Sequence, residues 1–127
     1  MSWPALLAVF VGGAVGSLAR ELLAPMVDLG RPWMATLAVN ILACLLIGWL
    51  YALRDALHRH LIHFGAVGFC GGFSTFSHFV LEIEGLLLGG AWLEAAAAAA
   101  LAIGLGIAAA VLGERLAVAY ARRRQGP

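Results

Sequence analysis

Charge is scarce in this sequence. Of its 127 residues, eight are basic and seven are acidic, while 63% are hydrophobic. All eight basic residues are arginine, so lysine is absent altogether. A soluble domain of this size carries far more charge on its surface. The composition therefore excludes an ordinary soluble domain, and the absence of a basic groove with interleaved aromatic residues gives no indication of a nucleic-acid partner.

Signatures of enzymes and redox proteins are missing as well. Neither a nucleotide-binding loop nor a cluster of hydrolase-type metal ligands occurs, so we expect no enzyme and no energy-coupling site. The two cysteines, Cys44 and Cys70, each lie inside an apolar run, where cysteine usually acts as a small hydrophobic residue. One metal alternative stays open, because His58, His60 and His63 lie close together in "HRHLIH" and histidine-rich tracts can bind metal.

Long apolar runs are what the chain has instead. A helix needs about 20 apolar residues to cross the hydrocarbon core of a bilayer. Four segments approach or exceed that length, with short connections between them: residues 3–26, 33–53, 61–88 and 95–113. We therefore predict an all-α, multi-pass membrane protein in which residues 1–127 form a single domain of four transmembrane helices.

Glycines in these segments recur at the spacing of helix-packing faces. The glycines concerned are Gly12 with Gly16, Gly68 with Gly72, and Gly104 with Gly106 in the alanine-rich fourth segment. Small residues let helix backbones approach one another closely in lipid. We interpret these positions as contacts within a tightly packed helix bundle.

A polar residue inside an apolar segment is costly, so each one is a candidate functional group. Asn40 lies in the second segment, with Thr36 and Cys44 four residues to either side on the same helical face. Its amide offers two N–H donors and one acceptor. The spacing leaves two interpretations open: hydrogen bonds between helices, or a site that faces a ligand.

The third segment contains "GFCGGFSTFSHF", residues 68–79, which is a poor helix sequence. Gly71 and Gly72 are followed directly by Ser74 and Thr75, so we predict a break in the helix here. Membrane proteins tolerate a break only where the freed backbone groups are buried in protein or line a polar cavity. Broken helices often coordinate cations with these carbonyls, so the break predicts an ion site.

Phenylalanine recurs after the glycine pair at every third position: Phe73, Phe76 and Phe79. Phenylalanine at helical spacing usually means packing, but here Ser77, His78 and Glu82 accompany it. Phenyl rings have an electropositive edge, which can hold a small anion weakly. Weak binding is what conduction requires, so the combination favours a permeating anion.

Three stretches together resemble one known family. "GFCGGFSTFSHF" in the third segment, "ATLAVN" in the second and "GSLAR" at the end of the first are similar to motifs of the Fluc or CrcB family of fluoride-exporting channels. The resemblance covers essentially the whole chain. It implies a fluoride-selective channel in the cytoplasmic (inner) membrane of a bacterium, which exports fluoride passively and lowers its cytoplasmic concentration. It further implies an antiparallel dimer of four-helix subunits with two anion pores.

The resemblance also implies roles for individual residues. The fluoride pore would be lined by Asn40, Phe76 and Phe79, with the neighbouring polar residues Thr36, Ser77, His78 and Glu82 and with Arg20 near the aqueous vestibule. A structural sodium ion, which is not transported, would be held by the backbone carbonyls of Gly71 and Ser74.

Three features depart from the family pattern. Ser74 stands where threonine is usual, His78 replaces a pore-lining threonine, and Val80 replaces a serine. The fourth segment also lacks the hydroxyl residues that help to form the family's polar track. A non-conducting or obligate-heterodimer subunit of the same fold is therefore an alternative. A small multidrug-type proton antiporter is less favoured, because the first segment has no carboxylate before Glu21.

The distribution of arginine bears on the second subunit. With four spans, six arginines fall on one side of the membrane and two, Arg20 and Arg31, on the other. Positive charge prefers the cytoplasmic side, which favours one orientation. Discounting Arg122, Arg123 and Arg124 near the end of the tail reduces the bias to three against two. With that discount we favour a dual-topology homodimer over a heterodimer.

Overall fold

The computed structural model describes residues 2–27 and 30–125, and in this part of the chain all regular secondary structure is helical, with no strand. The first segment is α1 (Trp3–Leu23), which a short 3₁₀ helix (Ala24–Met26) prolongs, and the second is α2 (Pro32–Ala52). The third consists of α3 (Arg59–Ile62), a π-helix (His63–Phe69), α4 (Cys70–Phe73) and α5 (Phe76–Leu88). The fourth is the single helix α6 (Trp92–Gln125). All four segments are long and apolar enough to cross a membrane, as the sequence predicted.

The boundaries follow from local residue chemistry. Proline lies in the first turn of both α1 and α2, where its missing N–H has no helical partner to lose. Gly30 and Gly90 have positive φ values of 80° and 77°, which allow the chain to turn before α2 and before α6. Helix α6 extends beyond the predicted end at residue 113, because strong helix formers without glycine or proline continue to Gln125.

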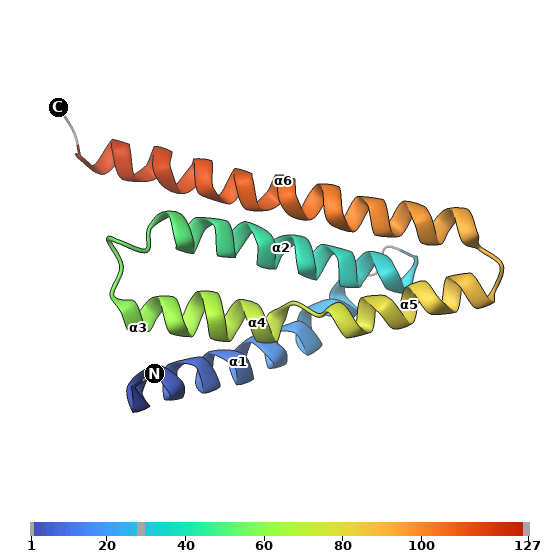
Figure 1. Cartoon of the computed structure of the whole chain (residues 1–127), viewed down its shortest axis with the longest axis horizontal. Helices are drawn as coiled ribbons and strands as arrows, with labels where there is room; N and C mark the ends of the chain where they lie inside the picture. Colours follow the sequence, from blue (N-terminus) through green and yellow to red (C-terminus); the bar gives the residue numbers. More distant parts are fainter. Residues whose placement is uncertain (1, 28–29, 126–127) are drawn as a thin grey trace.

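Figure 1 shows α2 between α6 and the third segment, with α1 crossing the outer side of that segment at an angle. Helix α1 begins, α2 ends and α6 ends at the same end of the bundle as α3. At the opposite end, Arg31 contacts the carboxylate of Glu94 at 2.6 and 2.7 Å, and the indole of Trp33 donates to it at 2.8 Å. These bonds connect the start of α2 to the start of α6.

Glycine permits the close helix contacts, but not at every predicted position. A Cβ atom on Gly12 or Gly16 would collide with backbone of the π-helix, and one on Gly68 or Gly72 would collide with backbone of α1. These four predictions are confirmed. The prediction for Gly104 is wrong: a Cβ there would meet no heavy atom within 4 Å. The close contacts of α2 with α6 are made instead by Gly48 against Ala110 and by Gly113 against Leu45.

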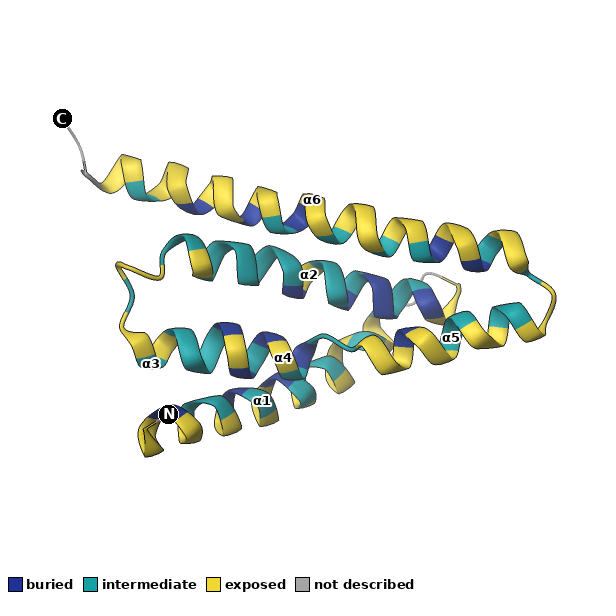
Figure 2. Cartoon of the chain, viewed as in Figure 1, coloured by how far each residue is buried: buried dark blue, intermediate teal, exposed yellow. Residues whose placement is uncertain are grey.

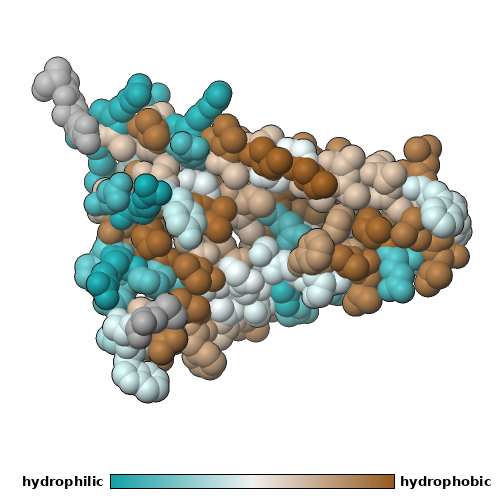
Figure 3. Space-filling view, viewed as in Figure 1, coloured by the Kyte–Doolittle hydropathy of each residue, from teal (hydrophilic) through white to brown (hydrophobic). Residues whose placement is uncertain are grey.

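Burial within the chain is limited. In the 18-residue apolar window of each segment, only 11–28% is buried within the chain. Helices α1 and α6 turn long exposed faces outward (Figure 2). The small core includes Val39 and Ala43 of α2 and Phe73 of α4, which pack together. In the space-filling view, hydrophilic side chains gather mainly at the end that contains α3, while much of the remaining surface is apolar (Figure 3). This is the surface of a chain that lipid or further protein must cover.

Candidate functional site

The third segment is not one continuous α-helix. Helix α4 ends at Phe73, and Ser74 and Thr75 are extended, with φ/ψ of −74°/155° and −145°/120°. Helix α5 then starts at Phe76, with the Thr75 hydroxyl accepting from the N–H of His78 at 3.3 Å. On the other side, the Ser74 hydroxyl donates to the carbonyl of Cys70 at 2.8 Å. Serine and threonine thus cap the two helix ends that they create.

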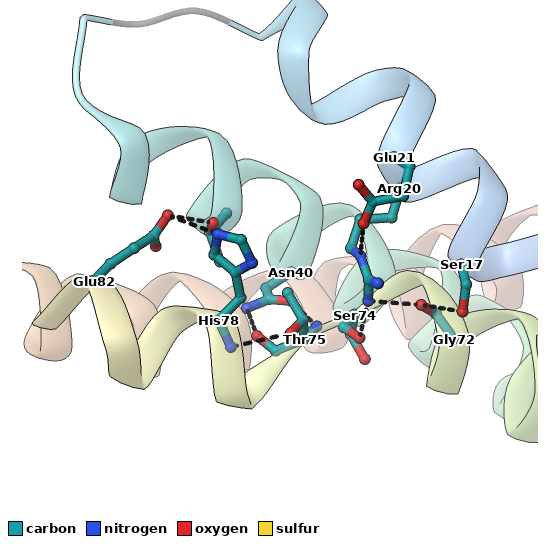
Figure 4. A network of polar contacts seen from close by, with 10 residues as sticks. Ser17, Arg20, Glu21, Asn40, Gly72, Ser74, Thr75, His78 and Glu82 are labelled. Carbon is teal, nitrogen blue, oxygen red and sulfur yellow. Dashed lines mark hydrogen bonds and ion pairs between the residues drawn. The ribbon is translucent and has the colours of Figure 1, made fainter.

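Asn40 bonds the backbone of this interruption from α2. Its Nδ2 donates to the Thr75 carbonyl at 2.9 Å, and its Oδ1 accepts from the Thr75 N–H at 2.8 Å (Figure 4). Both backbone polar groups of Thr75 therefore gain a partner that the helix does not provide. Of the two interpretations left open above, the hydrogen bond between elements is the one present in the chain. One N–H of the Asn40 amide is not used by these two bonds.

Helix α1 approaches the same interruption from the opposite side. Arg20 Nη1 donates to the carbonyl of Gly72 at 3.1 Å and, at the longer distance of 3.5 Å, to that of Ser74. The Ser17 hydroxyl, one turn before Arg20, also donates to the Gly72 carbonyl, at 3.3 Å. Sequence reasoning did not single out Ser17, although a hydroxyl on the same helical face as Arg20 was a usable signal.

The two residues expected to hold sodium lie three positions apart, Gly71 within α4 and Ser74 in the interruption. Gly71 is exposed, and a Cβ added to it would meet nothing within 4 Å. With Ser74 it borders a pocket of about 150 Å³. For the alternative site near His58, ring centroids of neighbouring histidines are 5.0 and 6.3 Å apart. Within residues 2–27 and 30–125, however, no group of three or more metal-ligating side chains is suitably placed, so the histidine alternative finds no support.

The phenylalanines do not form one stripe. Phe73 is buried in the core and stacks on Phe69 at a centroid distance of 5.4 Å, because the extended residues separate it from α5. Phe79 is also buried, at 9% exposure, whereas Phe76 is 80% exposed. Phe76 and Phe79 nevertheless border the same pocket of about 440 Å³. The other residues of that pocket are Asn40, Cys44, Ser74, Thr75, Ala99, Ala102 and Ile103.

A second cluster of polar side chains lies along α5, one to two helical turns beyond the interruption. The buried Thr36 hydroxyl donates to Glu82 Oε1 at 2.9 Å, and His78 Nε2 lies 3.7 Å from the same oxygen. The Glu82 side chain is 12% exposed, and its Oε2 is buried without a hydrogen-bond partner among residues 2–27 and 30–125. A pocket of about 60 Å³ next to His78 is bordered by Arg20, Glu21, Ala24, Thr36, Val39 and Thr75. Ser77 lies on the exposed side of α5, away from these contacts.

Most of the predicted site residues thus lie near the interruption and come from three elements, whereas Ser77 lies on the exposed side of α5. Helix α1 contributes Arg20, α2 contributes Thr36 and Asn40, and the third segment contributes the remaining ones. The walls that α6 adds to the larger pocket, at Ala99, Ala102 and Ile103, contain no hydroxyl.

Comparison with known proteins places this geometry in context. Residues 7–114 match the family described as "CrcB-like protein, Camphor Resistance (CrcB)". The chain is 52% identical to a protein of Ruegeria pomeroyi named fluoride-specific ion channel FluC, over 93% of this chain and 94% of the relative. It is 41% identical to the protein of the same name from Deinococcus radiodurans, over 91% and 97%. A protein of Nocardia farcinica named fluoride-specific ion channel FluC 2 is 42% identical, over 93% and 90%.

Proposed function

The chain belongs to the CrcB family, and on that premise we propose that it is a fluoride-specific ion channel, which exports fluoride passively and lowers its cytoplasmic concentration. It is a transmembrane ion-transport protein and not an enzyme. The small multidrug-type antiporter is thereby set aside. Its required carboxylate is also missing, since Glu21, the only acidic residue of α1, lies in the last turn with a 72% exposed side chain.

The observation that carries this proposal is the pairing of Asn40 with the Thr75 backbone beside an apolar pocket with two phenylalanines. Fluoride is strongly hydrated, so a path must offer donors in place of water. The remaining N–H of Asn40, the hydroxyl of Thr75 and the ring edges of Phe76 and Phe79 at this pocket are such donors. None of them is a full positive charge, so a bound ion can leave again.

The driving force needs no coupling site. A membrane potential that is negative inside pushes an anion outward with about 2.3 kcal/mol per charge for every 100 mV. This energy suffices for passive export through a multi-pass protein. We place the protein in the cytoplasmic (inner) membrane of a bacterium, where such a potential exists.

A second subunit would complete the pore. Phe76 is 80% exposed although it borders the pocket, and at most 28% of any span is buried within one chain. A second copy packed in the opposite direction would cover this surface and face the exposed ring of Phe76. A homodimer remains favoured over a heterodimer on the discounted arginine count, although the arginine triplet continues α6 as regular helix.

A structural sodium ion fits the same interface. Gly71 has open space in front of it, and Ser74 is extended, so its carbonyl does not continue the helix. Carbonyl oxygens are suitable ligands for a hard monovalent cation. Two carbonyls from one chain do not complete a coordination shell, so the ion would join the Gly71 and Ser74 carbonyls of two copies. Its role would be structural: it would add ligation to carbonyls of which that of Ser74 otherwise accepts only the long 3.5 Å bond from Arg20 Nη1.

Fluoride efflux from liposomes tests the function directly. Purified chain is reconstituted with internal potassium fluoride, valinomycin is added to carry potassium, and a fluoride electrode records the release. We expect release well above that of protein-free liposomes, and no comparable release of chloride from chloride-loaded liposomes. The apolar α6 wall of the pocket favours one alternative, an obligate-heterodimer or non-conducting subunit. Release no faster than from protein-free liposomes would support that alternative and refute conduction by this chain alone.

A further inference from the structure

Glu82 has a mostly buried carboxylate, and its two oxygens differ in their hydrogen bonding. Oε1 accepts a hydrogen bond from the Thr36 hydroxyl at 2.9 Å, while Oε2 is buried and has no hydrogen-bond partner in the part of the chain that the structure describes. An unpaired carboxylate oxygen within a membrane segment is costly, and intramembrane carboxylates usually have a partner that carries a function. The charge of this carboxylate therefore requires a compensating group nearby.

His78 is the titratable group nearest to Glu82. It lies one turn earlier on α5, with Nε2 at 3.7 Å from Oε1 and a side chain that is 67% exposed (Figure 4). The imidazole is therefore not enclosed by its own chain, so a water-filled fluoride path beside it would bring protons to the ring, which is within ion-pair distance of the carboxylate. Histidine changes its charge between about pH 5 and 8, unlike the other side chains of this region.

The other charged groups near the pair are engaged elsewhere. On α1, Arg20 and Glu21 share the small pocket with His78, but Arg20 is bonded to Glu21 and to the Gly72 carbonyl. On α2, the residue that faces Glu82 is the neutral Thr36. On α6, Glu94 is bonded to Arg31 and Trp33 at the far end of the bundle. Glu84, on α5 itself, is exposed.

We propose that His78 and Glu82 form one proton-binding pair beside the fluoride path, and that fluoride conduction increases when this pair takes up a proton. This inference rests on the proposed function. Without the proton the pair carries one negative charge, which repels an approaching anion. Uptake of a proton at the imidazole makes the pair an imidazolium–carboxylate contact with no net charge. Two charges about 4 Å apart interact by ~1 kcal/mol even in water, which corresponds to about a fivefold change in rate.

The test is fluoride efflux with equal pH on both sides of the liposome membrane, varied from about pH 8 to about pH 6, where histidine changes charge. Release from protein-free liposomes at each pH is subtracted, because hydrofluoric acid crosses lipid unaided. We expect the native chain to speed up about fivefold toward the acidic end. H78T and H78Q should lose this pH dependence, and E82Q should be fast at every pH. E84Q is the matched control, a neutralised glutamate two residues away, and should keep the native profile.

The outcomes separate this inference from the proposed function. Absence of efflux at every pH contradicts the proposed function. In that case the pair is still tested by NMR of the histidine ring nitrogens, assigned with H78Q, and the ring signals of His78 should change in E82Q because the contact with the carboxylate is lost. A native channel that conducts equally at all pH values overturns the inference. So does an unaltered pH profile in H78T or H78Q, or ring signals of His78 that are unchanged in E82Q.

Discussion

Replacement of Asn40 by aspartate separates two roles that this side chain combines. In N40D the new carboxylate would still accept from the Thr75 N–H, which now lies 2.8 Å from Oδ1 of Asn40. It would place a second oxygen where Nδ2 donates to the Thr75 carbonyl at 2.9 Å, so this hydrogen bond is lost. The loss costs about 0.6 kcal/mol on the average for bonds between membrane helices. Inserting the charge adds about 2.5–3.5 kcal/mol.

The effect on conduction should be about as large as the effect on folding. A negative charge about 4 Å from a passing fluoride raises its energy by ~4 kcal/mol at the effective dielectric constant near a protein surface. We therefore expect N40D to conduct roughly a thousandfold more slowly. The measurement is the fluoride-electrode assay, with size-exclusion chromatography to show that the variant remains assembled.

Asn40→Leu is the matched control for this experiment. It removes both hydrogen bonds to Thr75 but adds no charge, so it should destabilise the interruption while repelling fluoride less than N40D does. If N40D and N40L slow efflux equally, the role of Asn40 is to hold the backbone of the break. If folded N40D conducts as fast as the native chain, Asn40 does not face the permeating ion at all.

The packing and the charge distribution give three further predictions. Phe76→Ile and Phe79→Ile should each slow efflux, because the positive ring edge is lost. Only Phe79→Ile should lower the melting temperature in detergent, since Phe79 is buried and Phe76 is 80% exposed. Equal shifts in melting temperature for the two variants would contradict the structure. Gly48→Ala should destabilise the protein by ~1–3 kcal/mol, because its Cβ would overlap the Ala110 carbonyl. Gly104→Ala, with open space around it, should be neutral or stabilise by up to ~1 kcal/mol, and the order of these two melting temperatures is the check. The orientation is tested with a chain that has a cysteine added to its tail and is expressed alone. A dual-topology homodimer should be labelled from both sides of the membrane. Labelling from the cytoplasm only would mean that an oppositely oriented partner is required.

The broad architecture was predictable because it depends on quantities that a sequence shows directly. Segment length and hydropathy determine which helices can span a bilayer, and the first three were located within two residues of their structural bounds, whereas the fourth continues to Gln125 instead of ending at residue 113. The pairs Gly12–Gly16 and Gly68–Gly72 were recognisable because their spacing of four residues places both members on one helical face. These are local properties, and no knowledge of the tertiary arrangement is needed to read them.

The parts that failed depend on tertiary arrangement. The partner of Asn40 is the backbone of Thr75, 35 residues away, and no spacing rule indicates a contact to a main-chain group at that distance. The three phenylalanines were expected to follow the break, after Gly71 and Gly72, but the extended residues are Ser74 and Thr75, which separate Phe73 from α5. For Gly104, the error was to assume that every small residue in an alanine-rich helix marks a contact.

The polar contacts of the site have one property in common, which constrains how the channel can work. Ser17 and Arg20 bond the carbonyls before the break, Asn40 bonds the peptide after it, and Thr36 bonds Glu82. All of these bonds connect α1 or α2 to the third segment, and the residues of α6 at the larger pocket are apolar. An anion moving through that pocket would therefore meet donors on the side of α2 and α5 only.

For such a one-sided path, the charge at Glu82 would affect the energy of the passing anion more than it would between two polar walls, because no hydroxyl of α6 can offset it. The exposed Phe76 ring marks where a second subunit would close the open side. The one-sided placement of donors is thus a physical reason for a chain of this sequence to depend both on a partner and on the protonation of a neighbouring histidine.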